Sequence, residues 1–333
     1  MKLSTPVERP EGLPRLSHAD RLLLLGSCFT THIGTRLQEG KFACDVNPYG
    51  VLYNPLSLSA ALREINCGEP YTAERLYFHQ DCWHSPMHHG DFSSPDPAVT
   101  LARINGRLQA AHLQLQEATL LMLTLGTAWV YEQRMDGQVV GNCHKRPEAD
   151  FRRRRLSVEE IVADCTPLLE ELSASNPRLK VLFTVSPIRH VRDGLHDNQL
   201  SKSTLLLAID ELVHRFPDMV SYFPAYELLM DELRDYRFYA DDLVHPSTLA
   251  VELVWQRLTE ACMTPATREV LAACQEIGKM VAHRPLQPEG EAYKRFLEQI
   301  LLKIERLNEK CPTLDFQNER ETCHTRLNRL QNL

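Results

Sequence analysis

The sequence predicts an α/β fold with a parallel sheet, followed by a helical C-terminal extension. Short apolar runs at residues 21–25, 120–125, 180–185 and, more weakly, 219–223 alternate with amphipathic segments. This alternation is typical of parallel strands sandwiched between helices. Beyond residue 262 only helical periodicity continues. We therefore expect an α/β domain over residues 1–262 and a helical extension over residues 263–333.

Apolar residues that recur every three or four positions predict the helices. Ser157 with Glu160 three residues later has the pattern of a capping box at the start of one of them. The helices of the extension are expected to pack on the core or to mediate self-association. The predicted helices are 30–39, 55–66, 96–117, 158–173, 202–216 and 246–262 in the domain, and 264–282, 289–310 and 316–331 in the extension.

The charge balance argues against nucleic acid as a partner. With 37 basic and 44 acidic side chains, the formal net charge is -7, which repels a phosphate backbone. One basic run, Lys145 and Arg146 followed by residues 152–155, is either an anion site or a solvated face.

The chain is expected to be cytoplasmic and without a membrane partner. No apolar stretch approaches the roughly 18 residues that a spanning helix needs. Pro6, Glu8 and Pro10 stand where a secretory signal has its apolar region. The ten cysteines include no CxxC pair, as expected of free thiols in a reducing compartment.

Ser27 is the candidate nucleophile. An apolar strand runs through Gly26 into Ser27 and then directly into a helix. Such a turn exposes the hydroxyl at the carboxyl edge of a parallel sheet, where α/β folds bind ligands. The helix start adds N–H groups and a positive dipole end that favour a developing oxyanion.

The base that a serine nucleophile requires is expected from Asp242 and His245. These residues are three positions apart, so one loop can hold both and let the carboxylate orient the imidazole. Pro246 is expected to start the helix that follows.

Gly26-Ser27 together with Asp242-x-x-His245 resembles the first and last blocks of SGNH (GDSL-like) hydrolases. The string of residues 24–29, LLGSCF, is similar to the motif that names the GSCFA family, with Thr30 in place of its alanine. The resemblance covers roughly residues 3–262. Further matching strings are NPYGVLYNP at 47–55, WHS at 83–85, TLGTAW at 124–129, VSPIRH at 185–190 and YRFYA at 236–240.

The resemblance implies a three-layer flavodoxin-like fold, ester hydrolysis and an oxyanion hole. In the superfamily, the N–H groups of the nucleophile and of a glycine, here Ser27 and Gly50, hold the oxyanion together with an asparagine side chain. Thr127 stands where that asparagine is expected, so either Thr127 supplies the third donor, another donor such as Asn54 does, or the enzyme is slow. Losing one such donor typically costs about 10²–10³ in rate.

Other residues are weaker candidates. Cys28 is a rival nucleophile but is expected to point into the core. Seven side chains between residues 79 and 91 are either a metal site, a loop lining the cleft or a solvated surface: His79, Asp81, Cys82, His84, His88, His89 and Asp91. We expect no metal and no cofactor. Substrate contacts are expected from Asn54, His84, Trp129, His144, Lys145, Arg189 and His190; for Arg189, a salt bridge to Asp193 or to another acid at the edge of the core is the structural alternative.

The expected function is hydrolysis of acyl esters, with acetyl groups on carbohydrate as the preferred substrate by analogy with the superfamily. Two alternatives remain. An O-acyltransferase would use the same triad and exclude water from the acyl-enzyme. A non-catalytic glycan-binding protein on a hydrolase scaffold would explain the missing asparagine. The oligomeric state is not predicted.

Overall fold

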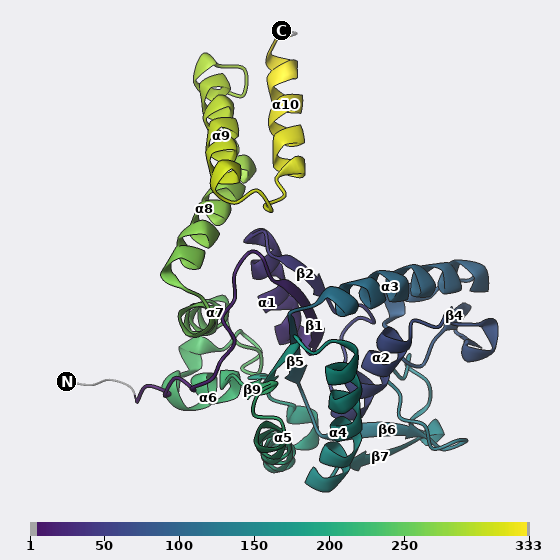
Figure 1. Ribbon diagram of the computed structural model, residues 1–333. Helices are drawn as coiled ribbons and strands as arrows, with labels where there is room; N and C mark the ends of the chain where they lie inside the picture. Colours follow the sequence, from purple (N-terminus) through teal and green to yellow (C-terminus); the bar gives the residue numbers. More distant parts are fainter. Residues whose placement is uncertain (1–4, 332–333) are drawn as a thin grey trace.

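A computed structural model describes residues 5–331, and its centre is a five-stranded, fully parallel sheet with the order β2-β1-β5-β8-β9 (Figure 1). Counted along the chain, the order is 2-1-3-4-5, which is that of flavodoxin-like doubly wound sheets. The predicted parallel α/β architecture is confirmed. The strands are β1 (Arg21–Gly26), β2 (Ala43–Val46), β5 (Leu120–Leu125), β8 (Lys180–Val185) and β9 (Val220–Tyr222).

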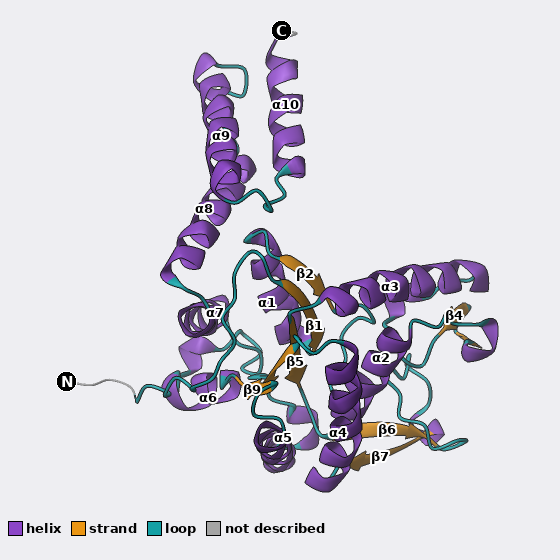
Figure 2. Cartoon of the chain, viewed as in Figure 1, coloured by secondary structure: helices purple, strands orange, loops and turns teal. Residues whose placement is uncertain are grey.

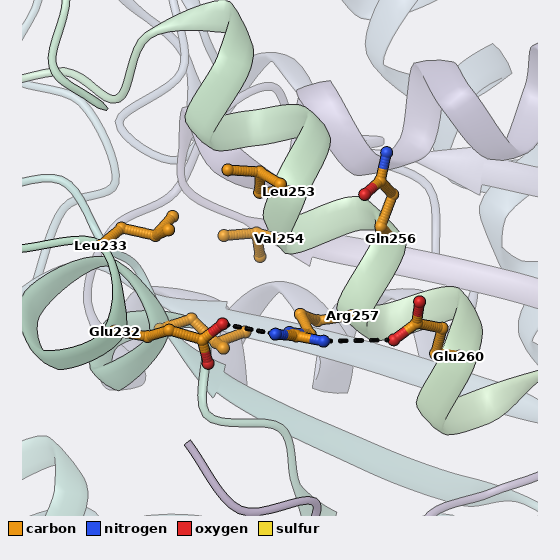
Figure 3. A pocket seen from close by; sticks show the side chains of 8 residues that line it. Glu232, Leu233, Leu253, Val254, Gln256, Arg257 and Glu260 are labelled. Carbon is orange, nitrogen blue, oxygen red and sulfur yellow. Dashed lines mark hydrogen bonds and ion pairs between the residues drawn. The ribbon is translucent and has the colours of Figure 1, made fainter. Parts of the chain in front are cut away.

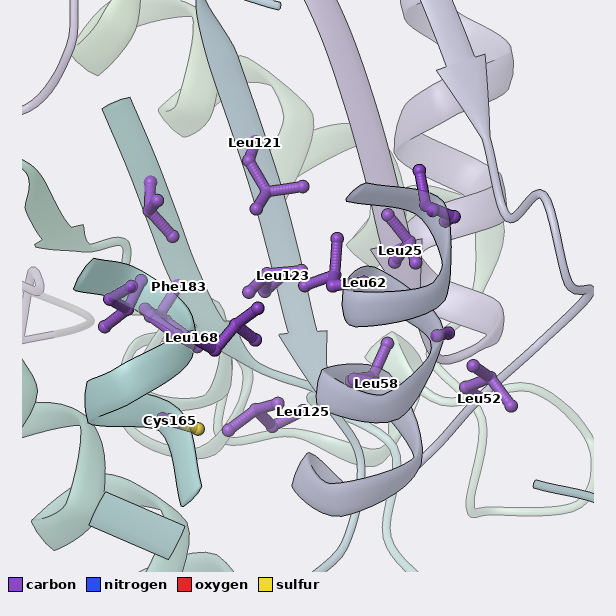
Figure 4. Close-up of a cluster of buried hydrophobic side chains, with 14 of the residues drawn as sticks. Leu25, Leu52, Leu58, Leu62, Leu121, Leu123, Leu125, Cys165, Leu168 and Phe183 are labelled. Carbon is purple, nitrogen blue, oxygen red and sulfur yellow. The ribbon is translucent and has the colours of Figure 1, made fainter. Parts of the chain in front are cut away.

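Helices cover both faces of the sheet. Leu23 and Leu25 point to one face, where they pack with α2 (Pro55–Cys67), α3 (Pro97–Glu117), α4 (Val158–Ser175) and α5 (Leu195–Arg215) (Figure 4). Leu22 and Leu24 point to the other, toward α1 (Cys28–Glu39) and α7 (Thr248–Cys262). A strand buried on both faces reads as a continuous apolar run, which is why β1, β5 and β8 were predictable. Each fully buried leucine contributes about 1.5–3 kcal/mol.

The edge strand β2 and two antiparallel hairpins were not predicted. The strand β2 is only partly buried and carries a mixed sequence, so it has no apolar run. The hairpins are β3 (Tyr77–His79) with β4 (Cys82–His84), and β6 (Trp129–Gln133) with β7 (Phe151–Arg155). The basic run of residues 152–155 thus lies in β7, where alternate arginines point to opposite faces.

Local capping decides where two helices begin. The capping box of Ser157 and Glu160 is confirmed. The expectation that Pro246 starts the last helix of the domain is wrong, because Ser247 is the N-cap of α7 and accepts the Ala250 N–H.

The C-terminal region is helical, as predicted, and rises away from the sheet (Figure 2). Its helices α8 (Pro265–Ala282), α9 (Glu291–Lys310) and α10 (Gln317–Gln331) share an apolar core of their own. Leu271 of α8 packs into the α1–α7 core, and Lys41 forms a 2.6 Å ion pair with Glu319. The extension therefore packs on the domain; the division at residue 262 stays a prediction.

Within residues 5–331, every helix falls short of the length and apolarity that a membrane crossing requires.

Candidate active site

A cleft of about 640 Å³ lies at the carboxyl edge of the sheet. Its lining includes Ser27 after β1, Thr127 after β5 and Ser186 after β8. The sheet order reverses between β1 and β5, and such a switch point is where doubly wound folds bind ligands. The topology therefore places Ser27 at the position where doubly wound folds commonly bind ligands.

The turn that carries Ser27 is tight. Gly26 has a φ of +149°, and a Cβ there would lie 2.4 Å from the carbonyl oxygen of Thr124. Asn47 Oδ1 accepts the Gly26 N–H at 2.9 Å, and Asn47 Nδ2 donates to Thr31 at 3.1 Å. Ser27 is the N-cap of α1, and its buried Oγ has no hydrogen-bond partner among the described residues. A buried hydroxyl left unpaired costs about 1–3 kcal/mol, so its position needs an explanation in function.

The loop before α7 holds Asp242 and His245 together. The Nδ1 of His245 donates to Asp242 Oδ2 at 2.5 Å. The backbone N–H groups of His245 and Val244 donate to Asp242 Oδ1, each at 2.9 Å. These bonds, the backbone ones first, lower the pKa of Asp242 to about 2. An ionised Asp242 keeps the hydrogen on Nδ1 and leaves Nε2 of His245 as the basic nitrogen.

Ser27 and His245 line the same cleft without a hydrogen bond between them. The Ser27 residue is 1% exposed, whereas the His245 side chain is 53% exposed. Catalytic hydrogen bonds are often long in unliganded enzymes and tighten with substrate. Leu243, between the two acid–base residues, has a left-handed φ of 57°. A hydrogen bond between His245 and Ser27 therefore needs a side-chain rotation or a shift of this loop.

Two of the expected oxyanion donors are already engaged. The Ser27 N–H donates to the Thr124 carbonyl at 3.2 Å, and the Gly50 N–H donates to the Asn47 carbonyl at 2.8 Å. Gly50, unlike Val51, is not part of the cleft lining. The expectation that the Gly50 N–H faces the oxyanion is therefore wrong for this conformation, since a turn inside the chain uses that amide.

Cys28 faces the cleft and not the core, so the expectation for its side chain is wrong. It lines the cleft, and its Sγ lies 3.5 Å from the Tyr53 hydroxyl. As the first residue of α1, Cys28 has an N–H without a hydrogen-bond partner in the described part of the chain. The amide after a nucleophile is a common oxyanion donor. Sequence reasoning expected N–H groups at this helix start to favour an oxyanion, but it did not single out the amide of Cys28.

The contacts of the Thr127 hydroxyl allow it to donate a hydrogen bond into the cleft. Its Oγ1 accepts the Trp129 N–H at 3.1 Å and lies 3.1 Å from Ser201 Oγ. Ser201 Oγ in turn accepts the Ala128 N–H at 2.8 Å. A hydroxyl has one hydrogen and two acceptor positions. When Ser201 donates to Thr127, the Thr127 hydrogen is left for the cleft.

Four of the expected substrate contacts line the cleft: Asn54, Trp129, Arg189 and His190. The Asn54 side chain is largely occupied as the N-cap of α2, where it accepts from Ser57 N and donates to Ser57 Oγ. Burial, followed by the charge of Lys202, lowers the pKa of His190 to about 4. The proposed Arg189–Asp193 salt bridge is absent from the described residues, because Asp193 pairs with Arg153.

His84, His144 and Lys145 are not part of the cleft lining. His84 contacts Ser93 Oγ at 2.7 Å and the His79 carbonyl at 3.0 Å, and the ring of His144 packs 4.4 Å from that of His84. The expectation that these three bind substrate does not fit this structure, because the β3–β4 hairpin and neighbouring loops use the two rings in their own packing.

The histidine-rich segment, residues 79–91, has no metal-binding geometry. Within the described ranges, no three His, Cys, Asp or Glu side chains are arranged to hold an ion. His88 is 1% exposed and stacks 4.1 Å from Tyr49, and burial lowers its pKa to about 3. His89 alone among these histidines lines the cleft.

Lys202 is an unpredicted residue beneath the cleft. This fully buried lysine donates from Nζ to the carbonyls of Gly126 at 2.6 Å and Ser186 at 2.7 Å. Burial lowers its pKa to about 7. Lys202 ties together the chain segments that follow β5 and β8. The available signal was its position on the apolar helix face, three and seven residues before Leu205 and Ile209.

A smaller pocket, of about 160 Å³, lies between η5 (Leu228–Glu232) and α7 (Figure 3). Arg257 donates to Glu232 at 2.5 Å and to Glu260 at 3.4 Å, so the charged side chains of this pocket are paired with one another. The described lining contains no serine, cysteine or histidine. The chemistry-bearing side chains thus lie in the larger cleft.

Comparison with known proteins agrees with the sequence motifs. Residues 21–258 match the GSCFA family, and residues 274–329 match the C-terminal domain of GSCFA domain proteins. None of the curated proteins matches the chain.

Proposed function

This chain belongs to the GSCFA family, and on that premise we propose that it is a serine hydrolase of the SGNH type that cleaves acyl esters. One observation carries the proposal: the imidazole of His245, held at 2.5 Å by Asp242, lines the same cleft as the Ser27 hydroxyl, which has no hydrogen-bond partner within residues 5–331. A carboxylate-held imidazole beside a serine at a helix start is the arrangement that activates an alcohol.

Acylation begins when the His245 ring moves within hydrogen-bond reach of Ser27. Nε2 of His245 takes the Ser27 proton while Oγ attacks the ester carbonyl. The same proton then passes to the departing alcohol, which leaves an acyl-serine. Water then attacks the acyl-serine with His245 as the base. The bond to Ser27 Oγ breaks, Oγ takes the proton back from His245, and the carboxylic acid is released.

The oxyanion is held in this proposal by the Cys28 N–H and the Thr127 hydroxyl. The first donor lies at the positive end of α1 and has no partner among the described residues. The second is oriented when Ser201 donates to it, because Trp129 N–H and Ser201 O–H then fill both acceptor positions. Thr127 thus takes the place of the asparagine of related hydrolases.

A fluorophosphonate probe tests the nucleophile. Wild type is expected to be labelled at Ser27, as mapped by mass spectrometry of the labelled peptide, and to hydrolyse an activated acetate ester. Ser27→Ala is expected to lose both. Cys28→Ala is the matched control, since it removes the rival thiol of the same cleft and keeps the backbone N–H. Label on Cys28 in place of Ser27 would reassign the nucleophile.

The same assay separates the alternatives. An acyltransferase would accept the label but release little acid until an acceptor alcohol is added. A glycan-binding protein without activity would take no label, while its circular dichroism shows a folded chain. Acetylated sugars then provide the screen for substrate.

A further inference from the structure

The cleft is cationic although the whole chain is acidic. The formal charge of the sequence is -7. Yet the permanently charged residues of the cleft lining are Arg153, Arg189 and Arg192 against one carboxylate, Asp193. They come from the β6–β7 hairpin and from the loop after β8. An anionic ligand can balance the excess positive charge of this lining.

The internal ion pairs do not remove the imbalance. Arg153 pairs with Asp193, whose side chain is 4% exposed, so those two charges cancel within the wall. Arg192 pairs with Glu148, but the two side chains are 70% and 82% exposed, where ion pairs are weak and screened by salt. Arg189 has no carboxylate partner in the described chain.

Arg189 instead contacts neutral groups. Its Nη2 donates to the Leu243 carbonyl, and its guanidinium lies 4.7 Å from the Tyr239 ring. Its charge therefore stays uncompensated beside the loop that carries Asp242 and His245. Two guanidinium groups of the lining, those of Arg189 and Arg192, are thus available to an anion.

Two buried donors in the same lining also lack acceptors. The indole Nε1 of Trp129 and the Nε of Arg189 are buried and have no hydrogen-bond partner among residues 5–331. Both atoms can only donate. Arg153 lies 4.4 Å from the Trp129 ring, so a cationic face covers the indole. These two nitrogen atoms expose almost no surface to the cleft, so it is the excess positive charge of the lining that matches a ligand group rich in anionic oxygen.

We propose that the cleft selects esters that carry an anionic oxygen group, a carboxylate or a phosphate, and that Arg189 and Arg192 are the residues that recognise it. The inference rests on the proposed esterase function and names its substrate class. The anionic group takes no part in the bond changes; it orients the ester relative to Ser27.

Three aryl acetates test this selectivity: 4-acetoxybenzoate, 4-acetoxyphenyl phosphate and the neutral methyl 4-acetoxybenzoate. Rates are divided by the hydroxide-catalysed rate of each ester to remove differences in reactivity. Wild type is expected to favour at least one anion by about 10- to 100-fold in kcat/KM, mostly through KM, as for hydrogen bonds to charged groups. Added salt should reduce this preference. The better of the two anions identifies carboxylate or phosphate.

Single substitutions test whether an arginine of the cleft lining causes the preference for anionic esters. Arg192→Gln is expected to lower the ratio of anionic to neutral kcat/KM by about tenfold. Arg152→Gln is the matched control, because it removes the same charge from the neighbouring strand β7 but does not line the cleft. An equal wild-type rate for charged and neutral esters, or an equal loss of preference in both variants, would overturn the inference.

Binding to Ser27→Ala keeps this test separate from the esterase proposal. Titration calorimetry compares 4-hydroxybenzoate and 4-hydroxyphenyl phosphate with methyl 4-hydroxybenzoate. Tighter binding of an anion, weakened by Arg192→Gln, supports the selectivity even when no ester is cleaved. Equal binding of all three refutes it, whereas a wild type that takes no label on Ser27 refutes the esterase proposal alone.

Discussion

Two histidine-bearing loops of this protein use the same side chain in opposite ways. In the Asp242–His245 loop, the imidazole is 53% exposed and fixed by a carboxylate through Nδ1. In the histidine-rich segment, His88 is 1% exposed, contacts Ser85 Oγ at 2.9 Å and stacks on Tyr49. The first ring is accessible to a reacting group, and the second is a packed core group.

The difference shows that environment, not residue type, decides what a histidine does. A carboxylate partner stabilises the imidazolium that general-base catalysis forms. Burial among aromatic rings opposes that charge, and it lowers the pKa of His88 to about 3. Clustering in sequence therefore did not predict a shared environment for the histidines, whereas the three-residue spacing of Asp242 and His245 correctly predicted their contact.

Removal of the exposed ring, that of His245, is expected to have the largest effect. His245→Ala is expected to lower ester hydrolysis by about 10⁴–10⁶-fold, as for triad members that act as a unit. Its thermal stability should stay close to that of wild type, because the ring is exposed. Steady-state kinetics and a melting curve of the same sample measure both. Near-normal hydrolysis by His245→Ala would remove this loop from the mechanism.

Substitutions of Thr127 test whether its hydroxyl holds the oxyanion in the cleft that His245 also lines. Thr127→Val removes the proposed oxyanion donor without changing shape and should lower kcat by about 10²–10³-fold, with little change in KM. Thr127→Ser keeps the hydroxyl and serves as the matched control, expected to retain most of the activity. Equal kcat values for the valine and serine variants would contradict a donor role.

His88→Ala tests whether the packed ring of His88 stabilises the fold. The substitution leaves a cavity against Tyr49 and removes one of the two hydrogen-bond partners of Ser85 Oγ, so the free energy of unfolding is expected to fall by about 2–4 kcal/mol. Urea titration measures this loss. The exposed His214→Ala is the control and should change stability by less than about 0.5 kcal/mol. A stable His88→Ala protein would show that its packing is dispensable.

The smallest expected effect is the pH dependence that His88 adds. Since its folded pKa, about 3, lies below the ordinary value of 6.5, the unfolded chain binds more protons between these values. Stability is therefore expected to fall as pH falls from 6.5 toward 3, by at most about 1.4 kcal/mol per pH unit from this group. Urea titrations at pH 7, 6 and 5 should show a smaller slope for His88→Ala than for wild type.

The fold was largely predictable because its strands are buried on both faces. Residues 120–125 and 180–185 were predicted with the observed bounds, since doubly buried strands are continuously apolar. The strand β2 was missed because it lies at the edge of the sheet, and the β6–β7 hairpin because arginines dominate one of its strands. Solvent contact removes the apolar signal from such elements.

Two parts of the site follow from local sequence alone. One is the Gly26-Ser27 turn, which only a residue without a Cβ allows; the other is the pairing of Asp242 with His245, which are three positions apart in one loop. Tertiary structure decided which distant side chains share the cleft and which amides are free. Lys202 meets Gly126, and Ser201 meets Thr127, across more than seventy residues. Such contacts depend on how α5 packs against the sheet, a long-range outcome that no local spacing encodes.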